Sequence, residues 1–198
     1  MNVSKAFGIL CGFVLLPGFA GDLEDGIKFH ERNNFVKAFA SFQAAAANGD
    51  REALRRLGFM YYHGESVPQD NRRAVALFEK AAVAGDIQSA SNLGKMYEFG
   101  MGVAQDEKRA AMWHLRGAEL GDADSQFNIS VMYYKGQGIP EDRIEAAKWW
   151  TLAMLKGGIY AERIRPSVES AEGKLTQAEI AEGRRRAAEW ARANESRK

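Results

Sequence analysis

The sequence predicts an all-α solenoid of stacked helix–turn–helix repeats. Three observations support this prediction. A Gly-Asp pair recurs every 36 residues, many other positions repeat in the same register, and each block of 36 residues holds two apolar runs with helical spacing. One such unit cannot bury its own apolar face, so neighbouring units are expected to stack on one another.

The repeat aligns without gaps over three blocks, 51–86, 87–122 and 123–158. The same residue types fill the same slots in all three, which makes a chance resemblance between the blocks implausible. The shared slots hold Met60-Tyr61, Met96-Tyr97 and Met132-Tyr133, then Gly64, Gly100 and Gly136, then Asp70, Asp106 and Asp142.

Each block is expected to form two helices. In the first block, Leu57, Met60 and Tyr61 share one face of a first helix. Gly64 is expected to end that helix, because glycine adopts the left-handed conformation of a helix C-terminus without strain. Asp70 is placed to cap the second helix, where a carboxylate accepts hydrogen bonds from free backbone N–H groups.

Altered units are expected on both sides of the three blocks. Residues 22–50 read as a degenerate first repeat, and residues 159–198 read as C-terminal capping helices. Within the latter, Pro166 should kink or interrupt a helix over 159–172, because proline lacks a backbone donor. Thr176 and Glu179 fit a capping box that opens a final helix, whose apolar stripe should cover the end of the stack.

The first twenty residues have the three-part plan of a secretory signal peptide. Lys5 gives a positive start, Ala6 to Leu16 is apolar, and small residues precede a cleavage site after Ala20. The apolar run is too short for a membrane span, which needs about 20 residues. We therefore expect an exported, periplasmic protein, with secretion as one alternative and an uncleaved N-terminal anchor as another.

The residue counts argue against several classes of function. Cys11 is the only cysteine and lies inside the expected signal, so the mature chain would have no disulfide and no cysteine-based nucleophile or metal site. The chain has 27 lysines and arginines against 26 aspartates and glutamates. This balance argues against general nucleic-acid binding, which depends on neutralising phosphates.

The repeat closely resembles the Sel1-like repeat, which is related to the tetratricopeptide repeat. The run from Leu93 to Asp106, followed by Ala110, Trp113 and Gly121, carries the resemblance best. The resemblance covers almost all of the mature chain and implies a right-handed α/α superhelix with a concave surface. Proteins of this family commonly serve as adaptors in bacterial envelopes and in host–microbe contact.

Catalytic motifs are scarce. Some small exported proteins of the family are described as penicillin-binding or β-lactamase-like, but these carry a disulfide in each unit. The sequence lacks the usual motifs of an activated serine, a zinc helix or a phosphate-binding loop. The pairs Gly100/Gly102 and Gly136/Gly138 recur at the repeat period, so we interpret them as turns. No catalytic residue and no cofactor are expected.

The histidines and aromatic residues are interpreted mainly as packing residues. His114 shares its slot with Phe78 and Trp150, so we expect a buried ring. His63 lies in a variable slot, His30 stands alone, and no metal site is expected. The repeated tyrosines and the tryptophans of the second helices, which are Tyr61, Tyr97, Tyr133, Trp113, Trp149 and Trp150, are also assigned to packing.

Variable positions on one face of the first helices are the candidates for binding. By similarity to related superhelices, this face lines the concave groove, and Tyr, Phe and Arg contribute binding energy when an interface desolvates them. The candidates are Arg55, Phe59, Tyr62, His63, Ser91, Lys95, Glu98, Phe99, Phe127, Val131, Tyr134 and Lys135. The alternative is that they form a solvated inner wall.

The expected function is that of an exported scaffold, which holds a protein or peptide partner on its concave face at the cell envelope. Two alternatives stay open. One is a β-lactamase-like or cell-wall-active hydrolase. The other is a carbohydrate-binding module that uses the aromatic groove.

Overall fold

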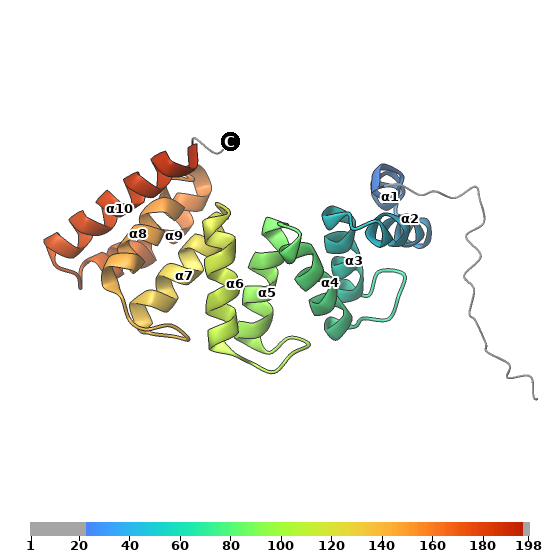
Figure 1. The fold of residues 1–198 in the computed structure, drawn as a ribbon, viewed down its shortest axis with the longest axis horizontal. Coiled ribbons are helices and arrows are strands. Elements are labelled where there is room, and N and C mark those ends of the chain that lie inside the picture. The colour runs from blue at the N-terminus through green and yellow to red at the C-terminus, as the bar shows by residue number, and fades with distance from the viewer. Residues whose placement is uncertain (1–22, 196–198) are drawn as a thin grey trace, which may run out of the picture.

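The computed structural model describes residues 23–195, which form ten α-helices and no β-strand (Figure 1). From α1 to α9, consecutive helices lie side by side along a curved path, and α10 packs on α8 at the far end. The expected signal peptide, residues 1–20, lies outside the described residues. The helices are α1 (Leu23–Glu31), α2 (Phe35–Ala47), α3 (Arg51–His63), α4 (Asn71–Val83), α5 (Ile87–Phe99), α6 (Glu107–Glu119), α7 (Ala123–Lys135), α8 (Arg143–Met154), α9 (Gly158–Glu172) and α10 (Gln177–Glu195).

The same local interactions begin and end the helices of each unit. An aspartate caps every helix from α3 to α8, as Asp70 does by accepting a hydrogen bond from the backbone of Arg73 at 3.0 Å. The first helices of the three units end at Gly64, Gly100 and Gly136, with φ of 73°, 68° and 67°. The expected caps are therefore confirmed.

A ring of the second helix packs over a glycine of the first helix inside the early units. Phe78 covers Gly58, where an added Cβ would lie 2.6 Å from the ring, and His114 covers Gly94 in the same way. His114 is fully buried, which confirms its expected role as a packed ring. In this way each unit joins its two helices before it stacks on the next.

The loop between the two helices of a unit rests on the preceding unit. Gly102, with φ of +76°, approaches the first residue of α4 so closely that a Cβ would lie 2.5 Å from the carbonyl of Asn71. Gly138 approaches Glu107, at the start of α6, in the same manner. One unit earlier, Ser66 occupies the position equivalent to Gly102. It has φ of 59°, and its hydroxyl donates a hydrogen bond to a backbone carbonyl of α2. We call these contacts the loop clasps.

Helix α9 is not interrupted at Pro166, although an interruption was one of the two outcomes expected there. The helix continues through this proline instead of ending there. The carbonyl that Pro166 leaves without an intrahelical donor belongs to Glu162, and both residues are exposed. Water can therefore satisfy that carbonyl, which removes the main penalty for a proline inside the helix.

Helix α10 covers the C-terminal end of the stack by packing on α8. The capping box is confirmed, because the Thr176 backbone donates to the Glu179 carboxylate at 2.7 Å and the Thr176 hydroxyl accepts from the Glu179 backbone at 3.2 Å. Gly183 lies against the backbone of α8, and the rings of Trp149 and Trp190 meet edge to face at 5.8 Å.

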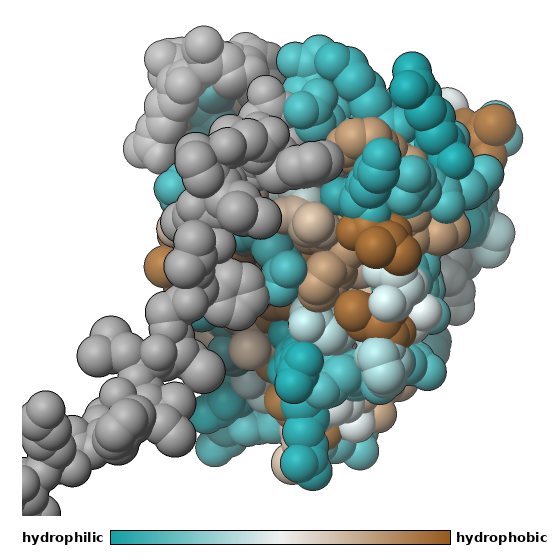
Figure 2. Space-filling view, turned by 90° about the vertical axis from the view of Figure 1, so that its right-hand side faces the viewer, coloured by the Kyte–Doolittle hydropathy of each residue, from teal (hydrophilic) through white to brown (hydrophobic). Residues whose placement is uncertain are grey.

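The N-terminal end has no such covering helix among the described residues. Figure 2 looks onto the end formed by α1 and α2, and its coloured part shows apolar residues lying between polar ones. Val36 of α2 is 73% exposed.

Candidate functional site

The four candidates on α3 are partly used in packing. The Arg55 Nε lies 3.1 Å from a carboxylate oxygen of Asp86, so this arginine joins α3 to the cap of α5. Phe59 stacks on His63 with ring centroids 6.0 Å apart, and the Tyr62 hydroxyl points to a methionine sulfur of the next loop at 3.7 Å. His63 is the most open of these four, since it is exposed and the other three are partly buried.

The candidates on α5 range from buried to open. Ser91 is only 7% exposed, which leaves little of it for a partner. Lys95 is half-buried, and Glu98 places a carboxylate oxygen 3.5 Å from Nε2 of the buried His114. Phe99 is 66% exposed at the end of the helix. Phe99 is therefore the α5 candidate that offers the most apolar surface.

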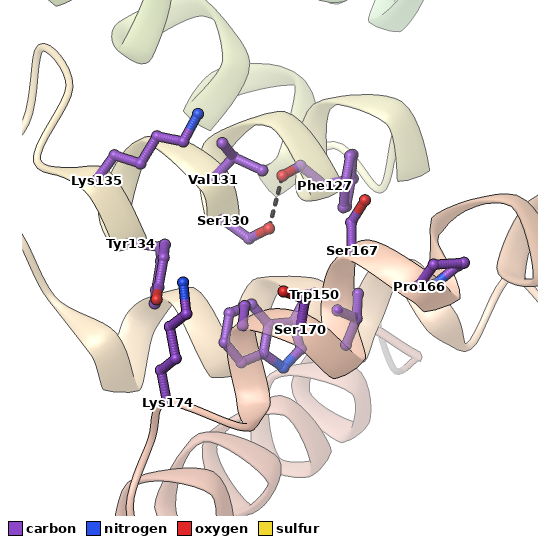
Figure 3. Close-up of a pocket in the computed structure, with 12 residues that line it drawn as sticks. Phe127, Ser130, Val131, Tyr134, Lys135, Trp150, Pro166, Ser167, Ser170 and Lys174 are labelled. Carbon is purple, nitrogen blue, oxygen red and sulfur yellow. Dashed lines mark hydrogen bonds between the residues drawn. The ribbon is translucent and has the colours of Figure 1, made fainter.

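The four candidates on α7 line a single cavity of about 460 Å³ between α7 and α9. We call this cavity the α7–α9 pocket. Figure 3 shows the side chains of α7 on one side of it and those of α9 across from them. The lining consists of Phe127, Ser130, Val131, Tyr134, Lys135, Trp150, Pro166, Ser167, Val168, Ser170, Ala171 and Lys174.

The pocket exists because α9 carries small side chains where other first helices carry large ones. Adding 36 residues to the α7 positions Val131, Tyr134 and Lys135 gives Ser167, Ser170 and Ala171, all three of which line the cavity. Since hydroxymethyl and methyl groups replace a phenol ring and a lysine chain, the space beside α7 stays unfilled.

The walls of the pocket are mainly apolar. Phe127, Val131 and Val168 contribute side chains, and Trp150 contributes part of an otherwise buried indole whose ring centroid lies 6.4 Å from that of Tyr134. The Ser130 hydroxyl donates to a backbone carbonyl of its own helix at 2.6 Å, drawn as the dashed line in Figure 3. This hydroxyl is therefore already used inside the helix.

Charge at the pocket comes from two lysines. Lys135 ends α7 and Lys174 follows α9, and both border the cavity (Figure 3). The twelve lining residues include no aspartate or glutamate. Neither lysine has an ion-pair partner among the described residues. Both ammonium groups are therefore available to a ligand.

Sequence reasoning found the α7 side of the pocket and missed the α9 side. The segment 159–172 was expected to be part of the C-terminal capping helices, and no binding residue was assigned to it. The positions one repeat after Val131 and Tyr134 are Ser167 and Ser170, and the repeat period is the signal that points to them. Trp150 was assigned to packing, and it is indeed only 3% exposed, although one edge reaches the cavity.

The described residues form neither a metal-binding cluster nor a membrane-spanning helix. Between residues 23 and 195, no three His, Asp or Glu side chains come together in a way that could hold a metal ion. His30 lies 2.9 Å from Glu65 and is remote in sequence from the other two histidines. None of the helices that the structure describes is both long and apolar enough to cross a membrane.

The comparisons with known proteins agree with this architecture. The Sel1 repeat model matches residues 21–50, 51–86, 87–122 and 123–157, so the chain belongs to the Sel1 repeat family. No curated protein matches the chain. Sel1 repeat proteins generally mediate interactions between proteins, and they are typically non-enzymatic scaffolds.

Two solved structures are similar to this one. The first is c5321, a protective antigen of uropathogenic Escherichia coli with an SLR fold, at 26% identity and a TM-score of 0.70. The match covers 84% of this chain and 37% of that one, so the chain spans little more than a third of the antigen. A Sel1 repeat protein from Oxalobacter formigenes shares the fold at 23% identity and a TM-score of 0.69, over 89% of this chain and 72% of that one.

Proposed function

We propose that the chain is a scaffold that holds a partner protein along the side formed by α3, α5, α7 and α9, with the α7–α9 pocket as the anchor. The observation that carries the proposal is that four variable residues of α7 line one cavity instead of filling a joint between units. Its volume of about 460 Å³ suits a site for a ligand group. The exposed Phe99 adds apolar contact area further along the same side.

The proposal includes a setting outside the cytoplasm, in the periplasm. It is supported by the positive start, the apolar run and the small residues before Ala20. In that setting the scaffold acts as an adaptor, bringing its partner to a place of assembly or regulation in the cell envelope.

Affinity capture from envelope extract tests the proposal. The purified chain is compared with a double variant, Phe127→Ala/Tyr134→Ala, which removes apolar contacts from the pocket. Met112→Ala is the matched control, because Met112 is 53% exposed on α6 and is not part of the pocket. We expect a protein that the unaltered chain and the control retain and the double variant loses.

Other results would contradict the proposal or support a different function. Equal capture by all three chains, or no capture, would contradict the proposal. Binding to arrayed glycans that requires Tyr134 would support a carbohydrate-binding module, and turnover of a chromogenic β-lactam by the purified chain would support a hydrolase. Circular dichroism of each variant confirms that the helices are intact.

A further inference from the structure

We infer that the α7–α9 pocket binds an acidic segment of the partner, with one large apolar side chain in the cavity and carboxylates beside Lys135 and Lys174. The inference rests on the proposed function, because it assigns the chemistry of the segment that the scaffold holds. It goes further by stating which segments the pocket accepts and which it rejects.

The charge of the pocket is the first argument. Three cations of the neighbouring helices are paired within the chain: Lys148 lies 3.0 Å from Glu145, Arg163 lies 3.0 Å from Asp124, and Arg184 lies 3.1 Å from Glu172. Among the described residues, Lys135 and Lys174 have no such partner, and no carboxylate lines the cavity that they border. A ligand with a carboxylate would supply the missing charge through charge-assisted hydrogen bonds.

The apolar walls are the second argument. Phe127, Val131, Val168 and the edge of Trp150 surround a space into which a large side chain can transfer its surface from water. Aromatic side chains bury roughly 150–250 Å² each and dominate the energetics of such contacts. The cavity therefore favours a bulky apolar residue at the centre of the bound segment.

The exposed serines of α9 are the third argument. Ser167 and Ser170 are exposed, line the cavity, and have hydroxyls that make no hydrogen bond within the described chain. Hydroxyls of this kind can donate to and accept from the backbone of an extended peptide. They offer a line of polar contacts along the wall opposite Tyr134 (Figure 3).

The same arrangement rejects other segments. A basic segment would bring like charge to two ammonium groups, and such juxtaposition is costly. A neutral apolar segment would cover the lysines without replacing their contact with water by an opposite charge. The two lysines and the cavity together therefore favour segments in which an acidic residue lies beside a large apolar residue.

A display selection tests the inference with protein purified after expression of the full sequence. The probe is a library of random twelve-residue peptides. Peptides that enrich are expected to carry Asp or Glu within two positions of a Phe, Trp, Tyr or Leu. Synthetic copies are then measured by fluorescence anisotropy, and their affinity should fall as salt is added, because salt screens exposed charges.

Two variants of the pocket accompany the selection. Lys135→Glu/Lys174→Glu should weaken the enriched peptides by about tenfold or more, because it puts like charges together. Lys108→Glu/Lys156→Glu changes the net charge equally at exposed sites outside the pocket and should leave affinity nearly unchanged. Ser170→Tyr fills the cavity with the residue that its slot holds in α7, and it should abolish binding.

A control for the added ring is Ala178→Tyr, at an exposed site on α10 outside the pocket, which should bind normally. Failure to enrich any peptide, enrichment without acidic residues, or equal binding by Ser170→Tyr would overturn the inference. The proposed function is judged separately. Suppose that the Lys135→Glu/Lys174→Glu variant still captures a partner from extract and the Phe127→Ala/Tyr134→Ala variant does not. This result would support the scaffold and reject the acidic segment. If both double variants still capture the partner, the proposed scaffold site and the acidic segment are both rejected.

Discussion

At the residue scale, His114 places two ring nitrogens in the core where Phe78, one unit earlier, places only carbon. His114 is fully buried, and neither nitrogen has a hydrogen-bond partner among the described residues. The Glu98 carboxylate comes within 3.5 Å of Nε2 without forming a hydrogen bond. A buried polar group without a partner costs about 1–3 kcal/mol.

His114→Phe should therefore stabilise the chain. Phe78 shows that a phenyl ring fits over the glycine of this slot, since it covers Gly58 as His114 covers Gly94. We expect a higher melting temperature, by about 2–4 °C for each kcal/mol recovered. Differential scanning calorimetry measures it, and a lower melting temperature would show that the imidazole makes a favourable contact.

A substitution in a loop clasp can distinguish the cost of backbone strain from the cost of steric contact. Gly102 and Gly121 both have positive φ, of +76° and +90°, but only Gly102 has a neighbouring backbone in the way of a Cβ. Gly121→Ala should cost about 1–2 kcal/mol for the left-handed conformation alone. Gly102→Ala should cost clearly more in urea unfolding. Equal costs would mean that the contact with Asn71 relaxes without penalty.

At the element scale, helix boundaries could be predicted because local chemistry fixes them. The aspartate caps and the terminal glycines lie at fixed slots, and Thr176 and Glu179 cap each other as expected. The interruption considered at Pro166 does not occur, because the penalty for a proline depends on whether water reaches the carbonyl that it leaves unpaired. That exposure is a property of packing, which a single segment does not reveal.

The docking of α10 on α8 includes one ion pair that results from a change at one slot. Arg73 and Arg109 fill this slot in earlier units, and Glu145 fills it in α8. The Glu145 carboxylate lies 3.0 Å from an Arg186 nitrogen, so the change of charge pairs the last repeat with its cap. The salt bridge is partly exposed, so its contribution is modest.

Helix α10 should weaken in acid. The Arg185 and Arg186 side chains donate hydrogen bonds to Glu182 and lower its pKa to about 2. Because the ordinary value is near 4.3, the unfolded chain binds the proton first, and the stabilisation is complete above about pH 4.3 and lost as the pH falls toward 2. Hydrogen exchange of α10 amides at several pH values measures this loss.

Glu182→Gln has no carboxyl to titrate at this position, so exchange in its α10 should depend less on pH than in the unaltered chain. Glu162→Gln is the control, because Glu162 is exposed and joins none of the ion pairs of the described chain. The same pH dependence in all three chains would show that the Glu182 pairs are too screened by solvent to matter.

At the scale of the whole molecule, the solenoid could be predicted because every unit repeats the same evidence. The α7–α9 pocket could be predicted only in part. Tyr134 and Lys135 were visible as variable positions, whereas the cavity depends on the small Ser167, Ser170 and Ala171 across from them. The size of a cavity depends on the side chains of both helices that border it. The sequence of one helix alone therefore does not predict the cavity.

The covered end of the stack predicts how the chain behaves without its cap. Ending the chain after Lys174 removes α10 and uncovers Ala147 and Trp149, which are now 0% and 2% exposed. We expect self-association in light scattering and a lower melting temperature, because newly exposed apolar surface favours contacts between chains. Ending the chain after Glu195 keeps α10 and is the control. A monomeric shortened chain with unchanged melting would contradict this role for α10.

The loop clasps bear on how such a chain can change length. The unit 87–122 carries both halves of a clasp: its Gly102 reaches back to Asn71 of the unit before, and Glu107 at the start of its second helix receives Gly138 of the unit after. An in-frame gene duplication of residues 87–122 would therefore bring a complete joint with it and leave the existing joints intact. Growth in steps of one repeat needs no redesign, whereas α10 must stay beside the repeat that carries Glu145.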